Sequence, residues 1–185
     1  MANKREAIVD ATIRHIAEQG GSFPTSLIAE DVGCSQSLIF RYFGSKELLF
    51  SACFDKVCLE LKEMVSQVEL PSDINRNSMN DYLIRLWEAY AEYLQSNSQV
   101  ARAYTYFISS GRMFPRGCRD ADDVIRKILG DQLERIKRAY PDFVFVTEYI
   151  ILVSNLVVTG NFLELKNMGE AMGKMGRVLK FGIYG

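Results

Sequence analysis

The stretch that decides the fold runs from Thr25 to Leu49 and reads TSLIAEDVGCSQSLIFRYFGSKELL. Gly33 and Gly44 divide it into two short segments and the start of a longer one, each with apolar residues at helical spacing. A hydroxyl residue suited to the N-cap position stands at the start of each segment: Thr25, Ser35 and Ser45. Two short helices joined by a tight, glycine-containing turn are typical of a helix-turn-helix, whose second helix enters the major groove of DNA.

The helical pattern continues on both sides of this stretch. From Lys4 to Gln19 the apolar residues share one face, and the Gly20-Gly21 pair ends that segment. His15 lies on the apolar face, so we interpret it as a core or boundary histidine rather than a ligand. Further helices are expected from Ser45 to about Val68 and over residues 78–96, 98–110, 120–140, 143–166 and 168–183, with little strand alternation. The predicted fold is all-α, with a three-helix DNA-binding domain over residues 1–48 and a larger helical domain over 49–185.

Composition and charge exclude several classes of protein. The 185 residues carry 22 Lys+Arg against 23 Asp+Glu, a formal net charge of −1. The longest apolar run free of charge lies between Glu148 and Glu164, shorter than the roughly 20 residues that a membrane span needs. No apolar stretch follows the charged N-terminus, so no signal peptide is expected and the protein is predicted to be soluble and cytoplasmic.

Little in the sequence points to catalysis. His15 is the single histidine, and the four cysteines show no Cys-x-x-Cys spacing, so neither a metal site nor a histidine-dependent nucleophile is predicted. No glycine-rich phosphate-binding motif occurs. We therefore expect no cofactor and no enzymatic activity.

Residues 25–49 resemble the TetR family of transcription regulators. The elements that carry the resemblance are Ile28-Ala29, Gly33 with Ser35, Phe40-Arg41-Tyr42-Phe43 and Ser45-Lys46-Glu47-Leu48-Leu49. The match covers roughly the first 50 residues, while the rest of the chain resembles the family in its helical pattern and length. The resemblance implies a homodimeric regulator, most often a repressor, which binds a palindromic operator in double-stranded DNA.

The second short helix of the motif offers several groups to DNA. Ile39 and Phe43, four residues apart, are expected to face the preceding helix, which leaves the other positions outward. Gln36 suits adenine, and the hydroxyls of Ser35 and Ser37 suit a base or a phosphate. Leu38 and Phe40 offer apolar contact to thymine methyl groups. The resemblance implies phosphate contacts from Tyr42, from Lys46 and from the N-terminus of the short helix that begins near Thr25. The predicted DNA-binding residues are therefore Thr25, Ser26, Ser35, Gln36, Ser37, Leu38, Phe40, Arg41, Tyr42 and Lys46.

Three of these residues also have a purely structural interpretation. Tyr42 can close the apolar end of the module, Lys46 can be a solvated charge, and capping occupies the hydroxyl of Ser35. The charge of the region adds a second expectation. Residues 1–50 hold five basic and six acidic side chains, so the usual basic surface of a DNA-binding domain is missing and the salt dependence of binding should be shallow.

The larger domain is predicted to provide dimerisation and an effector site. Residues 143–166 are apolar around the whole helix, and Gly169, Gly173 and Gly176 allow close approach of another helix, so residues of about 143–183 are expected to form the dimer interface. Ordinary core helices are the alternative. Aromatic residues and methionines concentrate in 79–114. Because this half of TetR family members commonly encloses a small-molecule effector, the resemblance implies that Trp87, Tyr90, Tyr104 and Phe107 contact a small apolar or aromatic effector. At helical spacing the same residues also suit a plain core.

Two other functions stay open at this stage. The same fold can act as a DNA-binding dimer without a small-molecule effector. Alternatively, a helical carrier or enzyme can use an apolar pocket in the larger domain. A ligand-induced rise in melting temperature, measured with and without operator DNA, distinguishes both of these functions from a ligand-responsive regulator.

Overall fold

The computed structural model describes residues 3–109, 121–139 and 141, and within those residues it contains helices and no strand, which confirms the all-α prediction. The helices are α1 (Lys4–Gln19), α2 (Thr25–Val32), α3 (Gln36–Phe43), α4 (Lys46–Ser66), α5 (Arg76–Ser96), α6 (Ser98–Ser109), α7 (Ala121–Leu129) and α8 (Gln132–Ala139). The helices expected over 143–166 and 168–183, and with them the predicted dimer interface, lie outside the described residues.

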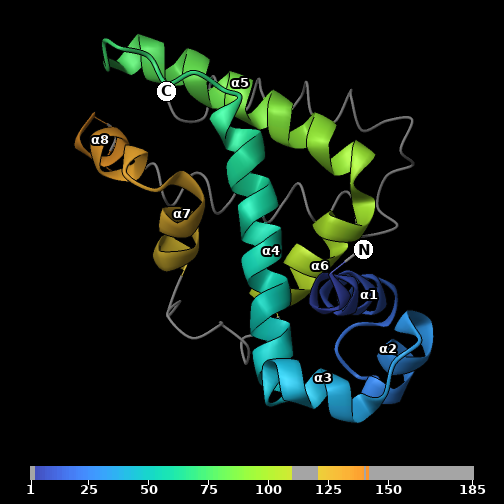
Figure 1. The fold of residues 1–185 in the computed structure, drawn as a ribbon. Helices are drawn as coiled ribbons and strands as arrows, with labels where there is room; N and C mark the ends of the chain where they lie inside the picture. The colour runs from blue at the N-terminus through green and yellow to red at the C-terminus, as the bar shows by residue number, and fades with distance from the viewer. Residues whose placement is uncertain (1–2, 110–120, 140, 142–185) are drawn as a thin grey trace.

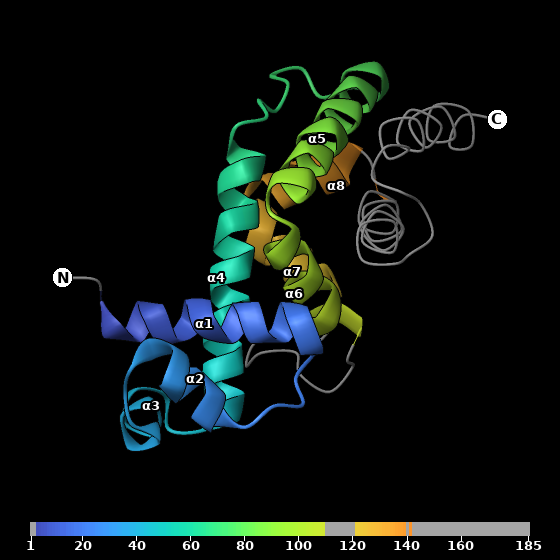
Figure 2. The ribbon, with the colours of Figure 1, turned by 90° about the vertical axis from the view of Figure 1, so that its right-hand side faces the viewer.

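Helix α4 is the element around which the other helices gather (Figure 1). Its N-terminal end packs against α1 and α3, and its later turns pack against α5, α6 and α7. Figure 2 shows α1 crossing α4, with α6 beside α1. The boundary drawn between residues 48 and 49 therefore falls inside the first turns of a helix that is shared by both parts of the molecule.

One continuous apolar core joins these helices. It extends from Ile8 on α1 through Phe54 on α4 to Ile136 on α8. The stretch of α4 from Leu49 to Phe54 contributes four fully covered side chains, Leu49, Phe50, Cys53 and Phe54. Because this stretch contacts both the N-terminal helices and α6, a shift of α4 changes the packing of both.

The predicted helix starts are confirmed at two positions and wrong at the third. The hydroxyl oxygens of Ser35 and Ser45 accept hydrogen bonds from the backbone N–H groups three residues later, at 3.3 and 3.2 Å. Thr25 does not cap α2. Pro24 occupies the N-cap position with an extended backbone, so Thr25 already belongs to the helix, and its side chain is buried and accepts a 3.4 Å hydrogen bond from Gln36.

The single helix expected over residues 120–140 is two helices. Gly130 separates α7 from α8 with a φ of +58°, and its N–H donates to the carbonyl of Arg126 at 2.8 Å. A left-handed residue ends the α-helical path, and glycine adopts this conformation without the steric cost of a side chain. The expected inward positions are nevertheless buried on both sides of the break, as Val124 and Leu133 show.

No helix in the described part of the chain is both long enough and apolar enough to cross a membrane.

Candidate nucleic-acid interface

The geometry of the helix-turn-helix comes from one glycine turn and one apolar contact. Gly33 adopts a left-handed conformation with a φ of +63°, and the next backbone N–H, that of Cys34, donates to the carbonyl of Ala29 at 2.8 Å. This turn redirects the chain within two residues and lets Ser35 cap α3. Ile39 and Phe43 on α3 and Ile28 on α2 are buried, as predicted, so α3 is fixed by its inner face.

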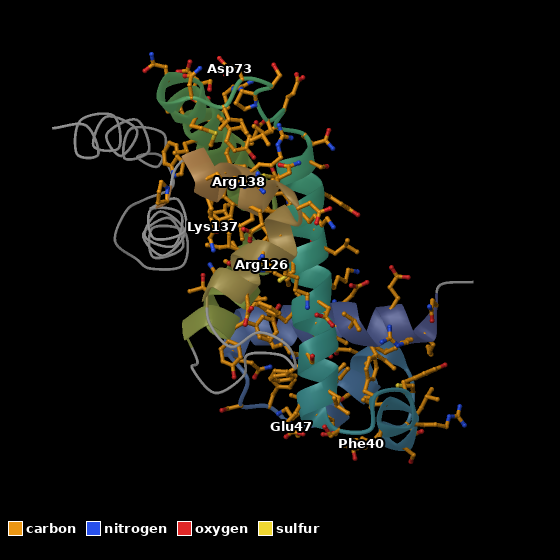
Figure 3. The ribbon with its side chains drawn as sticks, turned by 90° about the vertical axis from the view of Figure 1, so that its left-hand side faces the viewer. Phe40, Glu47, Asp73, Arg126, Lys137 and Arg138 are labelled. Atoms are coloured by element: carbon orange, nitrogen blue, oxygen red, sulfur yellow. The ribbon has the colours of Figure 1, made fainter. Side chains whose placement is uncertain are left out.

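The outer face of α3 is exposed and mixed in character. Gln36, Ser37 and Arg41 are exposed, and Leu38 is half-buried. Phe40 and Tyr42 are each 42% exposed, which is unusual for large aromatic side chains. Figure 3 shows Phe40 at the end of the molecule where α3 and the start of α4 meet, opposite the end that carries Asp73.

Exposed apolar side chains are concentrated at this end of the molecule. Four large apolar side chains stand out as exposed among the described residues, and three of them are Phe40 and Tyr42 on α3 and Leu48 in the first turn of α4. The fourth, Leu59, lies farther along α4. These side chains are available for contact with another molecule at this end.

Two of the predicted DNA-binding residues have structural roles. The Ser35 hydroxyl is engaged in the α3 cap, and the Thr25 side chain is buried beneath Gln36. Ser26 is exposed at the start of α2. The structure thus brings the outward residues of α3 together on one surface and places Thr25 beneath it.

Lys46 has an environment that the sequence did not reveal. Its Nζ donates a 3.1 Å hydrogen bond to the carbonyl of Gly21 and a second one to the carbonyl of Phe23. The same ammonium lies 4.7 Å from the ring centroid of Phe23 and 5.3 Å from that of Phe50. Burial lowers the pKa of Lys46. The ammonium expected at a DNA phosphate is therefore bound by the loop between α1 and α2.

The other basic side chains near α3 are engaged in different ways. Lys4 donates a 2.8 Å hydrogen bond to the carbonyl of Val32, the last residue of α2. The Arg5 guanidinium lies 5.0 Å from the centroid of the Phe43 ring. Arg14 pairs with Asp31 at 2.7 Å. Arg41 is exposed and makes no ion pair within the described part of the chain, so it is the basic group best placed for a phosphate or a guanine.

His15 acts as a boundary residue between α1 and α2, which agrees with the prediction. Its Nδ1 accepts a hydrogen bond from Gln19 at 2.8 Å, so its Nε2 carries the proton and donates to Asp31 at 2.9 Å. The hydrogen bond from Arg14, opposed in part by burial and supported by His15, holds the pKa of Asp31 below its ordinary value. These contacts fix the end of α2 on α1.

An apolar cavity of about 60 Å³ lies between α4, α5 and α7. Its lining consists of Leu61, Met64, Val65, Leu83, Leu86, Trp87, Tyr90, Ile125, Ile128 and Leu129. The structure therefore brings Trp87 and Tyr90 to a cavity, and their contact with an effector stays a prediction. Tyr104 and Phe107 lie elsewhere: their rings pack on that of Phe54, with centroid distances of 6.4 and 5.3 Å.

Across the described ranges, 3–109 with 121–139 and 141, no three His, Cys, Asp or Glu side chains come together in a way that would hold a metal ion. The feature that stands out chemically is the outer face of α3. With the tight glycine turn before it, this capped helix, fixed by its inner face and exposed on its outer face, has the geometry of the second helix of a helix-turn-helix.

Comparison with known proteins identifies the module. Residues 8–53 match the family model of bacterial regulatory proteins, tetR family. The matched segment spans α2 and α3, most of α1 and the first turns of α4. Residues 8–53 thus form a TetR-type DNA-binding domain, and the resemblance to the TetR family of transcription regulators is confirmed.

Solved structures extend the likeness of fold to more than nine-tenths of the chain. A tetR family protein from Shewanella sp. PV-4 is 18% identical, with a TM-score of 0.68 and 94% and 96% of the two chains covered. A TetR family transcription regulator from Marinobacter aquaeolei VT8 is 20% identical, with a TM-score of 0.65 and 94% of each chain covered. The fatty acid degradation regulator FadR from Bacillus halodurans is 16% identical, with a TM-score of 0.64 and 96% and 98% covered.

Proposed function

We propose that this protein is a homodimeric, ligand-responsive repressor that binds a palindromic operator through α3. The observation that carries the proposal is the outer face of α3, which presents exposed polar and aromatic groups while Ile39 and Phe43 anchor the inner face. The proposed DNA contacts are Ser26, Gln36, Ser37, Leu38, Phe40, Arg41 and Tyr42. Thr25, Ser35 and Lys46 are left out of this set because their polar groups are bonded within the protein, to Gln36, to the start of α3 and to the 20–24 loop.

A dimer follows from the small number of contacts that one domain can make. One α3 offers Arg41 as its exposed cation and only about two turns of helix to the groove. Two copies related by a two-fold axis double the contacts and match a palindrome with half-sites about one helical turn apart. Residues of about 143–183 stay the proposed interface on the basis of their sequence.

The cavity supports control by an apolar effector. Leu61, Met64 and Val65 line it from α4, the helix whose first turns pack against the DNA-binding helices. At about 60 Å³ it is smaller than the several hundred Å³ of an ordinary ligand site. An effector must therefore displace lining side chains or a lining helix as it enters, and a displacement of α4 would change how the DNA-binding helices are held. Trp87 and Tyr90 are the proposed effector contacts.

Selection of DNA tests the operator. Purified protein is mixed with genomic fragments of the organism that encodes it, and the retained fragments are sequenced. We expect enrichment of an inverted repeat, and loss of that enrichment with Gln36→Ala plus Arg41→Ala. Leu59→Ala, at an exposed position on α4 away from α3, is the matched control and should enrich the same repeat. Equal enrichment by the α3 variant would contradict the proposal.

A second experiment tests the effector. Apolar compounds that raise the melting temperature of the free protein are titrated into protein alone and into the protein–operator complex. A repressor that releases DNA must bind the effector more weakly in the complex, because a ligand shifts an equilibrium only by its difference in affinity for the two states. Equal affinity in both titrations would leave the DNA-binding function standing and remove the ligand response.

A further inference from the structure

The loop that joins α1 to α2 has the sequence Gly20-Gly21-Ser22-Phe23-Pro24. Side chains from two distant helices contact it, Lys46 from the first turn of α4 and Tyr106 from α6. The loop leads directly into α2, and α2 carries α3 through the Gly33 turn. Its position therefore determines where the helix-turn-helix lies relative to the rest of the molecule.

Lys46 binds the loop through several groups at once. Its ammonium donates to the carbonyls of Gly21 and Phe23, and it lies over the rings of Phe23 and Phe50. The carbonyls of one short loop converge on one cation, which fixes the path of the backbone between them. The electron-rich faces of these rings attract the ammonium and offset part of the hydration that it loses on burial.

Tyr106 lies against the same loop from the side of α6. A methyl group added at Gly21 would lie 1.9 Å from the Tyr106 Oη atom and 2.6 Å from its Cζ atom, and 3.1 Å from Cε2 of Phe50. One added at Gly20 would lie 3.6 Å from Cε2 of the same ring. Gly21 has no positive φ, so its lack of a side chain serves the close approach of the tyrosine rather than a backbone conformation. Figure 2 shows α6 beside the end of α1 where this loop begins.

We propose that Lys46 is a positioning residue, which holds the 20–24 loop in the place where Tyr106 packs against it. Through this contact between Tyr106 and the loop, α6 sets the orientation of α2 and α3. The inference rests on the proposed DNA-binding function. It gives Lys46 a role inside the protein in place of the phosphate contact that its place in the motif implies. It also adds a second route, through α6, by which the larger domain acts on the DNA-binding helices.

The Lys46 part of the proposal is tested by the salt dependence of operator binding. Lys46→Met keeps the aliphatic length of the side chain and removes the charge. We expect an affinity at least fivefold lower, with an unchanged slope of log affinity against log salt concentration. Arg41→Met is the matched comparison and should lower the slope, by about 0.9 for each phosphate that the variant no longer neutralises. A slope reduced equally in both variants, or an unchanged affinity for Lys46→Met, would overturn the assignment.

The Tyr106 part is tested by a double-mutant cycle. Gly21→Ala should weaken operator binding at least tenfold, because the new methyl group displaces the tyrosine ring. In a Tyr106→Leu background, which lacks the Oη and Cζ atoms, the remaining tight contact of the new methyl group is with Cε2 of Phe50, at 3.1 Å. A shift of a few tenths of an ångström relieves that contact, so the same substitution should change affinity less than threefold. An equal effect of Gly21→Ala in both backgrounds would show that the loop does not act through Tyr106.

Hydrogen exchange of the free protein separates failure of this proposal from failure of the proposed function. If the parent protein binds no DNA, the proposed function fails. Exchange at residues 25–43 then tests whether the 20–24 loop positions α2 and α3. Faster exchange in Lys46→Met and in Gly21→Ala, with Gly21→Ala silent in the Tyr106→Leu background, would support it. Unchanged exchange in folded variants would overturn it.

Discussion

Removal of the Phe40 side chain should weaken operator binding without weakening the fold. The ring is 42% exposed in the free protein. With about 200 Å² for a whole aromatic side chain, some 80 Å² remains to be buried against DNA. At about 25 cal/mol per Å² this area corresponds to about 2 kcal/mol, or about 30-fold in affinity for each half-site. Phe40→Ala should therefore bind its half-site about 30-fold more weakly.

The assay is a titration of labelled operator, followed by fluorescence anisotropy, with thermal unfolding as the test of folding. Leu59→Ala is the control, because Leu59 is 55% exposed but lies on α4 away from α3. Replacing individual thymines by deoxyuridine removes only the methyl group that Phe40 is expected to contact. At the contacted thymine this change should lower the affinity of the parent protein for the operator and leave the affinity of Phe40→Ala unchanged.

A folded Phe40→Ala protein that binds the operator within twofold of the parent would refute this prediction. Uniform effects of deoxyuridine in both proteins would refute the methyl contact alone, while a contribution of Phe40 through another part of the groove would stand.

Four further predictions concern charge, capping and backbone. Three of the five basic groups before residue 50, those of Lys4, Arg14 and Lys46, are bonded to protein oxygens. The slope of log affinity against log salt concentration should therefore indicate fewer than eight phosphate contacts per subunit. A steeper slope would contradict the assignment of these three residues. Ser45→Ala removes the α4 cap and should lower the free energy of unfolding by about 1 kcal/mol in denaturant titrations. It should also raise the pKa of Glu47, which the Ser45 hydroxyl lowers, and an unmoved pKa by NMR would count against that contact. The pKa of Asp31 is lowered from 3.8, chiefly by the hydrogen bond from Arg14. Its carboxylate therefore stabilises the fold above about that pH, and this contribution is lost as the pH falls through the lowered pKa. Asp31→Asn should reduce the difference between the free energies of unfolding at pH 6 and at pH 3. Gly130→Ala forces a side chain into a φ of +58° and should cost about 1 kcal/mol in the same denaturant titrations, although open space surrounds the position.

The sequence predicts most of the DNA-binding domain because its signals are local. Caps at Ser35 and Ser45 and helix ends at Gly33 and Gly44 depend on one residue and its near neighbours, and all four occur as expected. The apolar spacing of Ile39 and Phe43 likewise predicts the buried face of α3. Thr25 is the local exception, because Pro24 already supplies the N-cap conformation.

The contacts made by Lys46 are not local, so no sequence pattern predicts them. Its partners lie 23 and 25 residues earlier, and they are backbone carbonyls, whose direction depends on the folded path of the loop. The Gly20-Gly21 pair presents the same difficulty. Such a pair indicates a helix end and a close approach alike, and the positions of Tyr106 and Phe50 in the fold distinguish them at Gly21.

Helical spacing also fails to separate a cavity lining from a packed core. Trp87, Tyr90, Tyr104 and Phe107 have similar apolar surroundings along the sequence. In the fold, α5 carries the first two to the cavity, whereas α6 carries the last two onto Phe54. The difference depends on how the helices cross, which the spacing of apolar residues along one helix does not encode.

Protection of guanine N7 atoms from methylation on the selected operator would show whether α3 reads the major groove as half of a symmetric pair. We expect two protected segments in the major groove, with centres about one helical turn apart or a multiple of it, and loss of both with Gln36→Ala plus Arg41→Ala. Protection confined to one segment, or protection that persists in that variant, would contradict the proposed mode of DNA binding.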